Sequence, residues 1–112
     1  MEYVEQQFEK AIRTLVIGQG DIRSRLLMVC EDFYSLQDRN FSDFSAEIKE
    51  DWEWIYRQLH RWEPEYKEDG SVRNGSVEVT LKKIKNKTGL NIAKRIYDLR
   101  YKIKKFNKPN KF

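Results

Sequence analysis

This sequence is poor in the residues that build disulfides, metal sites and membrane spans. Its 112 residues include one cysteine, Cys30, and one histidine, His60. A single cysteine cannot form an internal disulfide, and these two residues are too few for a structural zinc site. No run of 18 or more apolar residues is present, so no transmembrane helix is expected. We therefore expect no metal, no cofactor and no membrane partner.

The beginning of the sequence also lacks the pattern of a secretory leader. Residues 1–5 are acidic and do not show the basic and then apolar order of a signal peptide. Together with the single cysteine, this predicts a cytoplasmic protein. The small size and the use of Lys, Asn, Ile and Tyr give the impression of a bacterial or phage accessory protein, although no motif assigns the chain to a family.

Proline is scarce, with two residues, whereas charged and aromatic residues are abundant. Charged residues make up 36% of the chain, hydrophobic residues 39% and aromatic residues 13%. A disordered chain would hold far fewer aromatic residues. Narrow apolar stripes facing inward and broad charged faces in water are typical of a small helical protein.

Apolar residues recur at alternating spacings of three and four in four segments, as on one face of a helix. The stripes run from Val4 to Leu15, from Ile22 to Leu36, from Ile48 to Trp62 and from Ile92 to Phe106. The sequence therefore predicts an all-α fold, a small antiparallel bundle of about four helices. We expect residues 1–106 to form a single helical-bundle domain and residues 107–112 to form a basic tail.

Local signals suggest where these helices begin and end. Gly18 suits the left-handed position just past a helix C-terminus. Asp21 and Ser45 are good N-caps for the second and third helices, and Pro64 is expected to close the third. Residues 86–89, Asn-Lys-Thr-Gly, interrupt the last pattern as a kink or a true break.

The stretch 71–81 has two interpretations. Asn74 and Gly75 form a hairpin signal, and residues 77–81 alternate like a strand. However, Val77 and Leu81 also fit a helix that Ser76 could cap, and no convincing second strand is available. We favour the helix and keep a short hairpin at 71–81 as the alternative.

Few residues indicate chemistry. The segment 18–21, Gly-Gln-Gly-Asp, lacks the rest of a phosphate-binding fingerprint, so we interpret it as a turn between helices. The nearby Arg23 and Arg25 are secondary candidates for holding an anion at the second helix N-terminus. Arg57 and His60 are spaced more closely than the Arg and His pair of some helical ribonucleases, and nothing signals an organised pocket around them.

The remaining reactive side chains have plain structural interpretations. Cys30 lies on an apolar face, so a buried and inert thiol is expected. The four acids of the third helix spread around it and are expected to be solvated: Glu47, Glu50, Asp51 and Glu53. We therefore predict that the protein is not an enzyme.

Charge polarity is the clearest functional signal. Residues 76–112 hold 12 Lys and Arg against 2 acidic residues, a net charge of +10, whereas residues 1–75 hold 10 against 16, a net charge of −6. Such a basic segment can meet phosphates or an acidic protein surface. The candidate binding surface comprises Lys82, Lys83, Lys85, Lys87, Lys94, Arg95, Tyr97, Arg100, Tyr101, Lys102 and Lys105.

These observations lead to one preferred function and one alternative. Trp54 and Tyr56 fall off the apolar stripe and are secondary candidates for a protein-binding patch, because Trp and Tyr anchor interfaces. We expect a non-catalytic helical interaction module that binds a protein or complex through its charge-polarised surface. The alternative is a nucleic-acid-binding subunit that uses residues 82–105. A surplus apolar stripe could also pair two copies into a homo-oligomer.

Overall fold

The computed structural model describes residues 2–108 and confirms the all-α bundle. Of the predicted basic tail, residues 109–112 lie outside the described residues, and Asn107 is the last residue of the final helix. No helix within residues 2–108 is both long and apolar enough to cross a membrane. In chain order the elements are α1 (Glu2–Ile17), α2 (Ile22–Phe33), the 3-10 turn η1 (Asp38–Phe41), α3 (Ala46–Leu59), β1 (Glu65–Tyr66), β2 (Val72–Asn74), α4 (Ser76–Lys83) and α5 (Asn86–Asn107).

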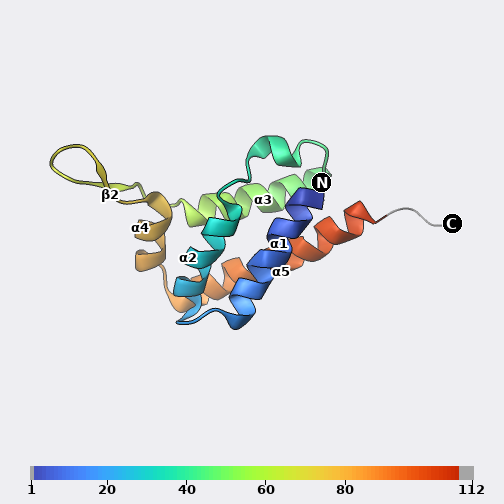
Figure 1. Cartoon of the computed structure of the whole chain (residues 1–112), viewed down its shortest axis with the longest axis horizontal. Helices are drawn as coiled ribbons and strands as arrows, with labels where there is room; N and C mark the ends of the chain where they lie inside the picture. The colour runs from blue at the N-terminus through green and yellow to red at the C-terminus, as the bar shows by residue number, and fades with distance from the viewer. Residues whose placement is uncertain (1, 109–112) are drawn as a thin grey trace.

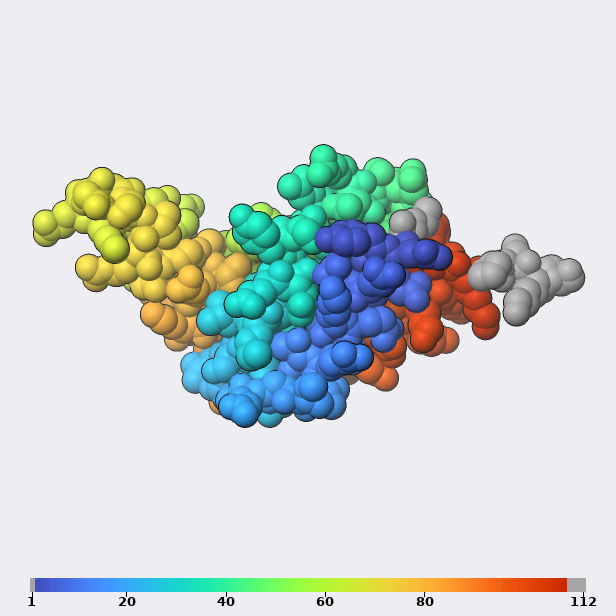
Figure 2. Space-filling model, in the orientation of Figure 1, coloured from blue at the N-terminus to red at the C-terminus, as the bar shows by residue number. Residues whose placement is uncertain are grey.

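The helices form two layers (Figure 1). One layer is the antiparallel hairpin of α1 and α2, and the other is the antiparallel pair of α3 and α5. The short helix α4 lies at one end, beside α2 and α3, and the β1–β2 ribbon projects beyond it. In Figure 2 the surface is hollowed between α2 and the α4 end of the molecule.

The predicted N-caps of α2 and α3 are confirmed. The Asp21 carboxylate accepts a hydrogen bond from the Ser24 N–H at 3.0 Å, and the Ser45 hydroxyl accepts one from the Ile48 N–H at 3.4 Å. The prediction for Gly18 is wrong, because the left-handed residue of this elbow is Gly20, with φ +86°. Gly18 is instead pressed against the preceding turn, where a Cβ would lie 2.4 Å from the Thr14 carbonyl oxygen.

The stretch 71–81 contains the end of a small ribbon as well as the start of a helix. Residues 77–81 belong to α4, as we favoured, and β2 precedes them. The ribbon pairs Glu65 with Asn74, and its turn contains Gly70 at φ +87°. The hairpin signal at residues 74–75 was therefore misleading, since Gly75 is the N-cap of α4. Ser76 is not the cap, because its hydroxyl donates to the Trp62 carbonyl at 2.6 Å.

The break before the last helix comes earlier than the sequence predicted. Ile84 and Lys85 separate α4 from α5, so residues 86–89 form the first turn of α5. Gly89 is buried where α5 crosses α2, and a Cβ on it would lie 3.0 Å from the Ile22 Cγ2 atom. This glycine permits close helix packing rather than interrupting the helix.

An aromatic cluster fills the core between the two layers. Trp52 is only 3% exposed, stacks on Phe41 with ring centroids 4.6 Å apart and meets Phe33 edge-on at 5.4 Å. Phe8 of α1 packs against Phe33 at 4.8 Å, so α1, α2, η1 and α3 meet at one point. The third helix ends at Leu59, before Pro64, and Trp62 therefore lies beyond it and is only partly buried.

Candidate functional site

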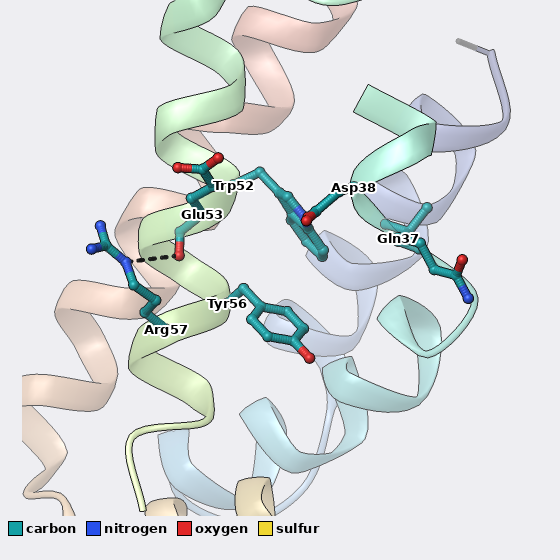
Figure 3. Close-up of a pocket in the computed structure, with 7 residues that line it drawn as sticks. Gln37, Asp38, Trp52, Glu53, Tyr56 and Arg57 are labelled. Atoms are coloured by element: carbon teal, nitrogen blue, oxygen red, sulfur yellow. Dashed lines mark hydrogen bonds between the residues drawn. The ribbon is translucent and has the colours of Figure 1, made fainter. Parts of the chain in front are cut away.

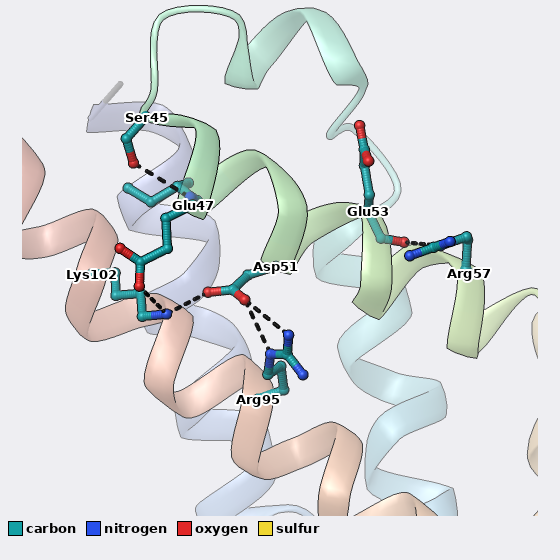
Figure 4. Close-up of polar contacts among 8 residues, drawn as sticks. Ser45, Glu47, Asp51, Glu53, Arg57, Arg95 and Lys102 are labelled. Carbon is teal, nitrogen blue, oxygen red and sulfur yellow. Dashed lines mark hydrogen bonds and ion pairs between the residues drawn. The ribbon is translucent and has the colours of Figure 1, made fainter.

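Three cations of the predicted basic surface face the protein's own acids. Lys102 Nζ lies 2.7 Å from Asp51 Oδ2 and 2.8 Å from Glu47 Oε1, and Arg95 Nη2 lies 3.1 Å from Asp51 Oδ1 (Figure 4). These pairs join α5 to α3. The hydrogen bonds that Lys102 donates to Asp51 and Glu47 raise its pKa, because both carboxylates favour its charged form.

Asp51 corrects the prediction that the acids of α3 are solvated. Its side chain is 8% exposed, whereas that of Glu47, one turn earlier, is 70% exposed. The Arg95 guanidinium also lies 4.6 Å from the centre of the Trp54 ring, so this predicted patch residue is partly covered from within the protein.

The third inward cation joins α5 to α1. Arg100 Nη1 lies 3.0 Å from Glu9 Oε1, and its guanidinium lies 5.3 Å from the centre of the Tyr97 ring. The hydrogen bond to Glu9 raises the pKa of Arg100. Nearby, the Asn107 amide donates to Glu5 Oε1 at 3.0 Å. The inward cations therefore connect helices rather than forming a free surface.

The other predicted residues lie on the outside of the molecule. The lysines among them make no ion pair with any residue in the described range 2–108. Tyr97 and Tyr101 are also exposed, at 53% and 60%. The exposed lysines of the predicted surface are Lys82, Lys83, Lys85, Lys87, Lys94 and Lys105, and Lys104 joins them.

The secondary candidates Arg23 and Arg25 hold the α1–α2 elbow together. Arg23 pairs with Asp21 at 3.0 Å and donates to the Ile84 carbonyl at 3.3 Å. Arg25 donates to the Leu15 carbonyl at 3.2 Å. Both guanidinium groups thus bind the protein itself.

A groove that the sequence did not reveal runs between α2 and α3 and reaches the start of α4. Two adjoining hollows, of about 420 Å³ and about 800 Å³, share Leu36, Gln37, Trp52 and Tyr56. We call this the α2–α3 groove, and Figure 3 shows its end beside η1, where Trp52 and Tyr56 of α3 face Gln37 and Asp38. The larger hollow is lined further by apolar and aromatic side chains that include Leu27, Cys30, Phe33, Tyr34, Leu59 and Val77.

A second stripe along α2 and its C-cap is the feature of the sequence that could have indicated this groove. This stripe lies beside the core stripe on the helix surface, and its members are spaced by three and four residues. They are Leu27, Cys30 and Tyr34, and each lines the groove. Cys30 was expected on an apolar face, and that face borders the groove as well as the core. Two apolar stripes on one helix thus indicate two packing surfaces, of which only one is filled here.

The groove contains two side chains of reactive types, Cys30 and His60. Burial raises the pKa of the Cys30 thiol to about 12, so the thiol is protonated at neutral pH and is a poor nucleophile. The His60 ring stacks on Tyr56 with centroids 4.0 Å apart, and its Nδ1 lies 2.9 Å from the Tyr56 carbonyl oxygen. The described part of the chain places no group of three His, Cys, Asp or Glu side chains that could hold a metal ion.

Carboxylates surround the groove. Four exposed acidic residues line it: Glu31 of α2, Asp38 of η1, Glu53 of α3 and Glu78 of α4. No side chain in residues 2–108 pairs ionically with any of the four. Arg57 is the one cation among the groove-lining residues in the described chain.

Comparisons with known protein families, with curated proteins and with solved structures find no match to this chain. The molecule offers two candidate binding surfaces, the acid-rimmed α2–α3 groove and the outer side of α5.

Proposed function

We propose that this protein is a non-catalytic interaction module whose α2–α3 groove binds a basic amphipathic helix of a partner protein. The observation that carries the proposal is the exposure of aromatic side chains over an apolar floor inside a ring of unpaired carboxylates. An amphipathic helix laid into such a groove buries its apolar face and leaves its polar face at the rim.

The apolar part of the groove supplies the contact area. Tyr34 is 89% exposed, and Tyr56 and Leu27 are each more than two-fifths exposed. Tyr and Trp are the residues that most often dominate binding energy in protein interfaces. From Trp52 to Leu59, α3 provides about 10 Å of groove wall, which accommodates about two turns of a bound helix.

The charge of the rim selects the chemistry of the partner. Among the described residues that line the groove, four are acidic and only Arg57 is basic, so the rim carries a net negative charge. Lys or Arg on the polar face of the ligand would meet these carboxylates, whereas an acidic helix would be repelled. The protonated Cys30 and the stacked His60 support a binding role rather than a catalytic one.

The test is binding of a pair of designed peptides with identical apolar faces. One peptide carries Lys at its polar positions and the other carries Glu. We expect the Lys peptide to bind and to shift the amide resonances of α2, α3 and the start of α4 in NMR spectra. Equal binding of the two peptides, or shifts confined to α5, would refute the proposal.

Matched tyrosine variants locate the contact. Tyr34→Ala and Tyr56→Ala should each weaken Lys-peptide binding by about tenfold or more, as expected of interface aromatics. Both side chains are exposed, so the fold should survive, which circular dichroism checks. The control is Tyr66→Ala in the ribbon, an exposed tyrosine outside the groove. An equal loss in the control would contradict the assignment.

A further inference from the structure

The solvent-facing side of α5 carries a regular stripe that is separate from the core. Every member is exposed and lies three or four residues from the next, so all share one face of the helix. The stripe extends about 26 Å along the helix axis, at 1.5 Å per residue. We call it the α5 outer stripe, and it consists of Lys87, Leu90, Lys94, Tyr97, Tyr101 and Lys104.

No acidic side chain within residues 2–108 neutralises the charge of the stripe. Lys87, Lys94 and Lys104 form no ion pair with any described residue, and Lys105 beside them forms none either. Asp98 is the one acid of α5 in its described part. In contrast, Arg95, Arg100 and Lys102 on the inner side are all paired. The lysines that remain are therefore available to bind an anion from outside.

The tyrosines give the stripe a second property. Tyr97 and Tyr101 are 53% and 60% exposed and lie one turn apart, about 6 Å along the axis. The Arg100 guanidinium lies over one side of the Tyr97 ring, 5.3 Å from its centre. Exposed aromatic rings among lysines can stack on unpaired bases while the ammonium groups meet the phosphates.

A cleft beside Tyr101 adds room for such a base. It has a volume of about 820 Å³ and lies between the last turns of α5 and the first turns of α1. Tyr101, Lys104 and Lys105 form one wall, and Glu2 and Glu5 are part of the other. The strand backbone is therefore expected on the lysine side, with a base directed into the cleft.

We infer that the α5 outer stripe binds single-stranded nucleic acid. Bases of a duplex are stacked 3.4 Å apart along each strand and offer no free face to tyrosines. An acidic protein is the other class of polyanion, but lysine is depleted from protein interfaces. This inference is independent of the proposed function, because the stripe shares no residue with the α2–α3 groove.

The first experiment measures binding of a fluorescent single strand of about 16 nucleotides, as oligo(dT) and as oligo(rU), by anisotropy. With four lysines on phosphates, affinity should fall about 50-fold between 50 and 200 mM salt. A duplex of the same length and a poly-glutamate peptide serve as competitors. Absence of binding at low salt, or equally effective competition by either competitor, would overturn the inference.

The second experiment reverses the charge of the stripe. The triple variant Lys87→Glu/Lys94→Glu/Lys104→Glu should abolish binding at physiological salt. These side chains are exposed and unpaired, so circular dichroism should show an unchanged fold.

A control of equal net charge separates the stripe from a general effect of protein charge. Lys10→Glu/Arg39→Glu/Lys67→Glu makes the same change in charge at exposed positions on α1, η1 and the ribbon turn. We expect it to retain most of the affinity. An equal loss in this control would show that net charge, rather than the stripe, drives binding.

The third experiment tests stacking. Tyr97→Ala/Tyr101→Ala leaves every lysine in place and should weaken single-strand binding by at least about tenfold, the size expected for lost base–aromatic stacking. It should leave the salt dependence unchanged, since no phosphate contact is removed. A loss of less than about twofold would refute the role of the tyrosines and, with it, the assignment to single strands.

Discussion

Replacing Asp51 with Asn tests whether the α3–α5 contact depends on one buried charge. The Asp51 side chain is 8% exposed and accepts hydrogen bonds from Lys102 Nζ at 2.7 Å and from Arg95 Nε at 3.1 Å. Asn has nearly the same shape but no charge, and one of its two polar atoms is a donor. The substitution therefore removes the shared counter-ion of two cations and directs a donor at one of them.

The expected cost follows from how far the cations can be solvated. Removing one partner of a fully buried ion pair costs roughly 3–5 kcal/mol. Here the Lys102 and Arg95 side chains are 35% and 40% exposed, so water can partly replace the lost carboxylate. We expect Asp51→Asn to lower the free energy of unfolding by about 2 kcal/mol, which corresponds to a fall in Tm of about 8 °C for a domain of this size.

The same lysine provides the matched control. Glu47 Oε1 lies 2.8 Å from Lys102 Nζ, but the Glu47 side chain is 70% exposed. Glu47→Gln removes the same charge from the same cation and should cost less than about 0.5 kcal/mol, as surface pairs do. Urea denaturation followed by far-UV circular dichroism measures both variants, with an unchanged m-value as the check on comparable unfolding. Equal effects of the two substitutions would refute the argument that burial sets the magnitude.

Three further predictions concern single side chains. Trp52→Ala should cost about 4 kcal/mol in the free energy of unfolding, because it empties the centre of the aromatic cluster; a cost below about 1 kcal/mol would contradict its central role. Cys30 should react with a thiol reagent much more slowly in the native protein than in denaturant, because its pKa is about 12 and it is largely buried; equal rates would contradict this. The folded-state pKa of Lys102 is raised above 10.5, so its stabilising effect should be complete below that pH and be lost as the pH rises through the higher folded value. The stability difference between the wild type and Lys102→Met should therefore shrink in alkali, and a constant difference would argue against the pairing.

Sequence reasoning succeeded where a structure depends on neighbouring residues alone. Apolar spacing identified all the long helices, because one buried face imposes a period of three and four on any amphipathic helix. Asp21 and Ser45 were correctly predicted as caps for a similar reason, since a cap binds a backbone N–H three residues ahead. These features require no knowledge of what lies across the core.

It failed where distant segments decide the role of a residue. Gly89 was interpreted as part of a break, but its role is to admit Ile22 of α2 at the helix crossing. Gly75 gave the hairpin signal behind the alternative interpretation of residues 71–81, although the ribbon turn falls at Gly70 and Gly75 is the N-cap of α4. Glycine can occur at a helix crossing, in a turn or at a helix N-cap. Only the residues packed against it in the folded protein show which of these roles it has.

The binding surfaces show the same division. The α2–α3 groove escaped detection because a hollow forms only when two helices and a turn are placed around it. The sequence identified which segment is basic, but not which of its residues face the protein and which face solvent. Its members close to the core stripe, such as Arg95 and Lys102, meet acids of α3, and the identity of those acids depends on the packing of α3 against α5.

The basic segment therefore carries two sets of cations with opposite experimental signatures. Those on the inner side of α5 are paired with α3 and α1, so replacing them should change stability and leave ligand binding to the folded protein nearly intact. Those on the α5 outer stripe are exposed and have no ion-pair partner within residues 2–108, so replacing them should change binding and leave stability nearly intact. The net charge of +10 over residues 76–112 sums both sets and does not distinguish the paired cations from the exposed ones. For a helix that lies on the surface of a bundle, the angular position of each charge about the axis, rather than the number of charges, determines what the segment can bind.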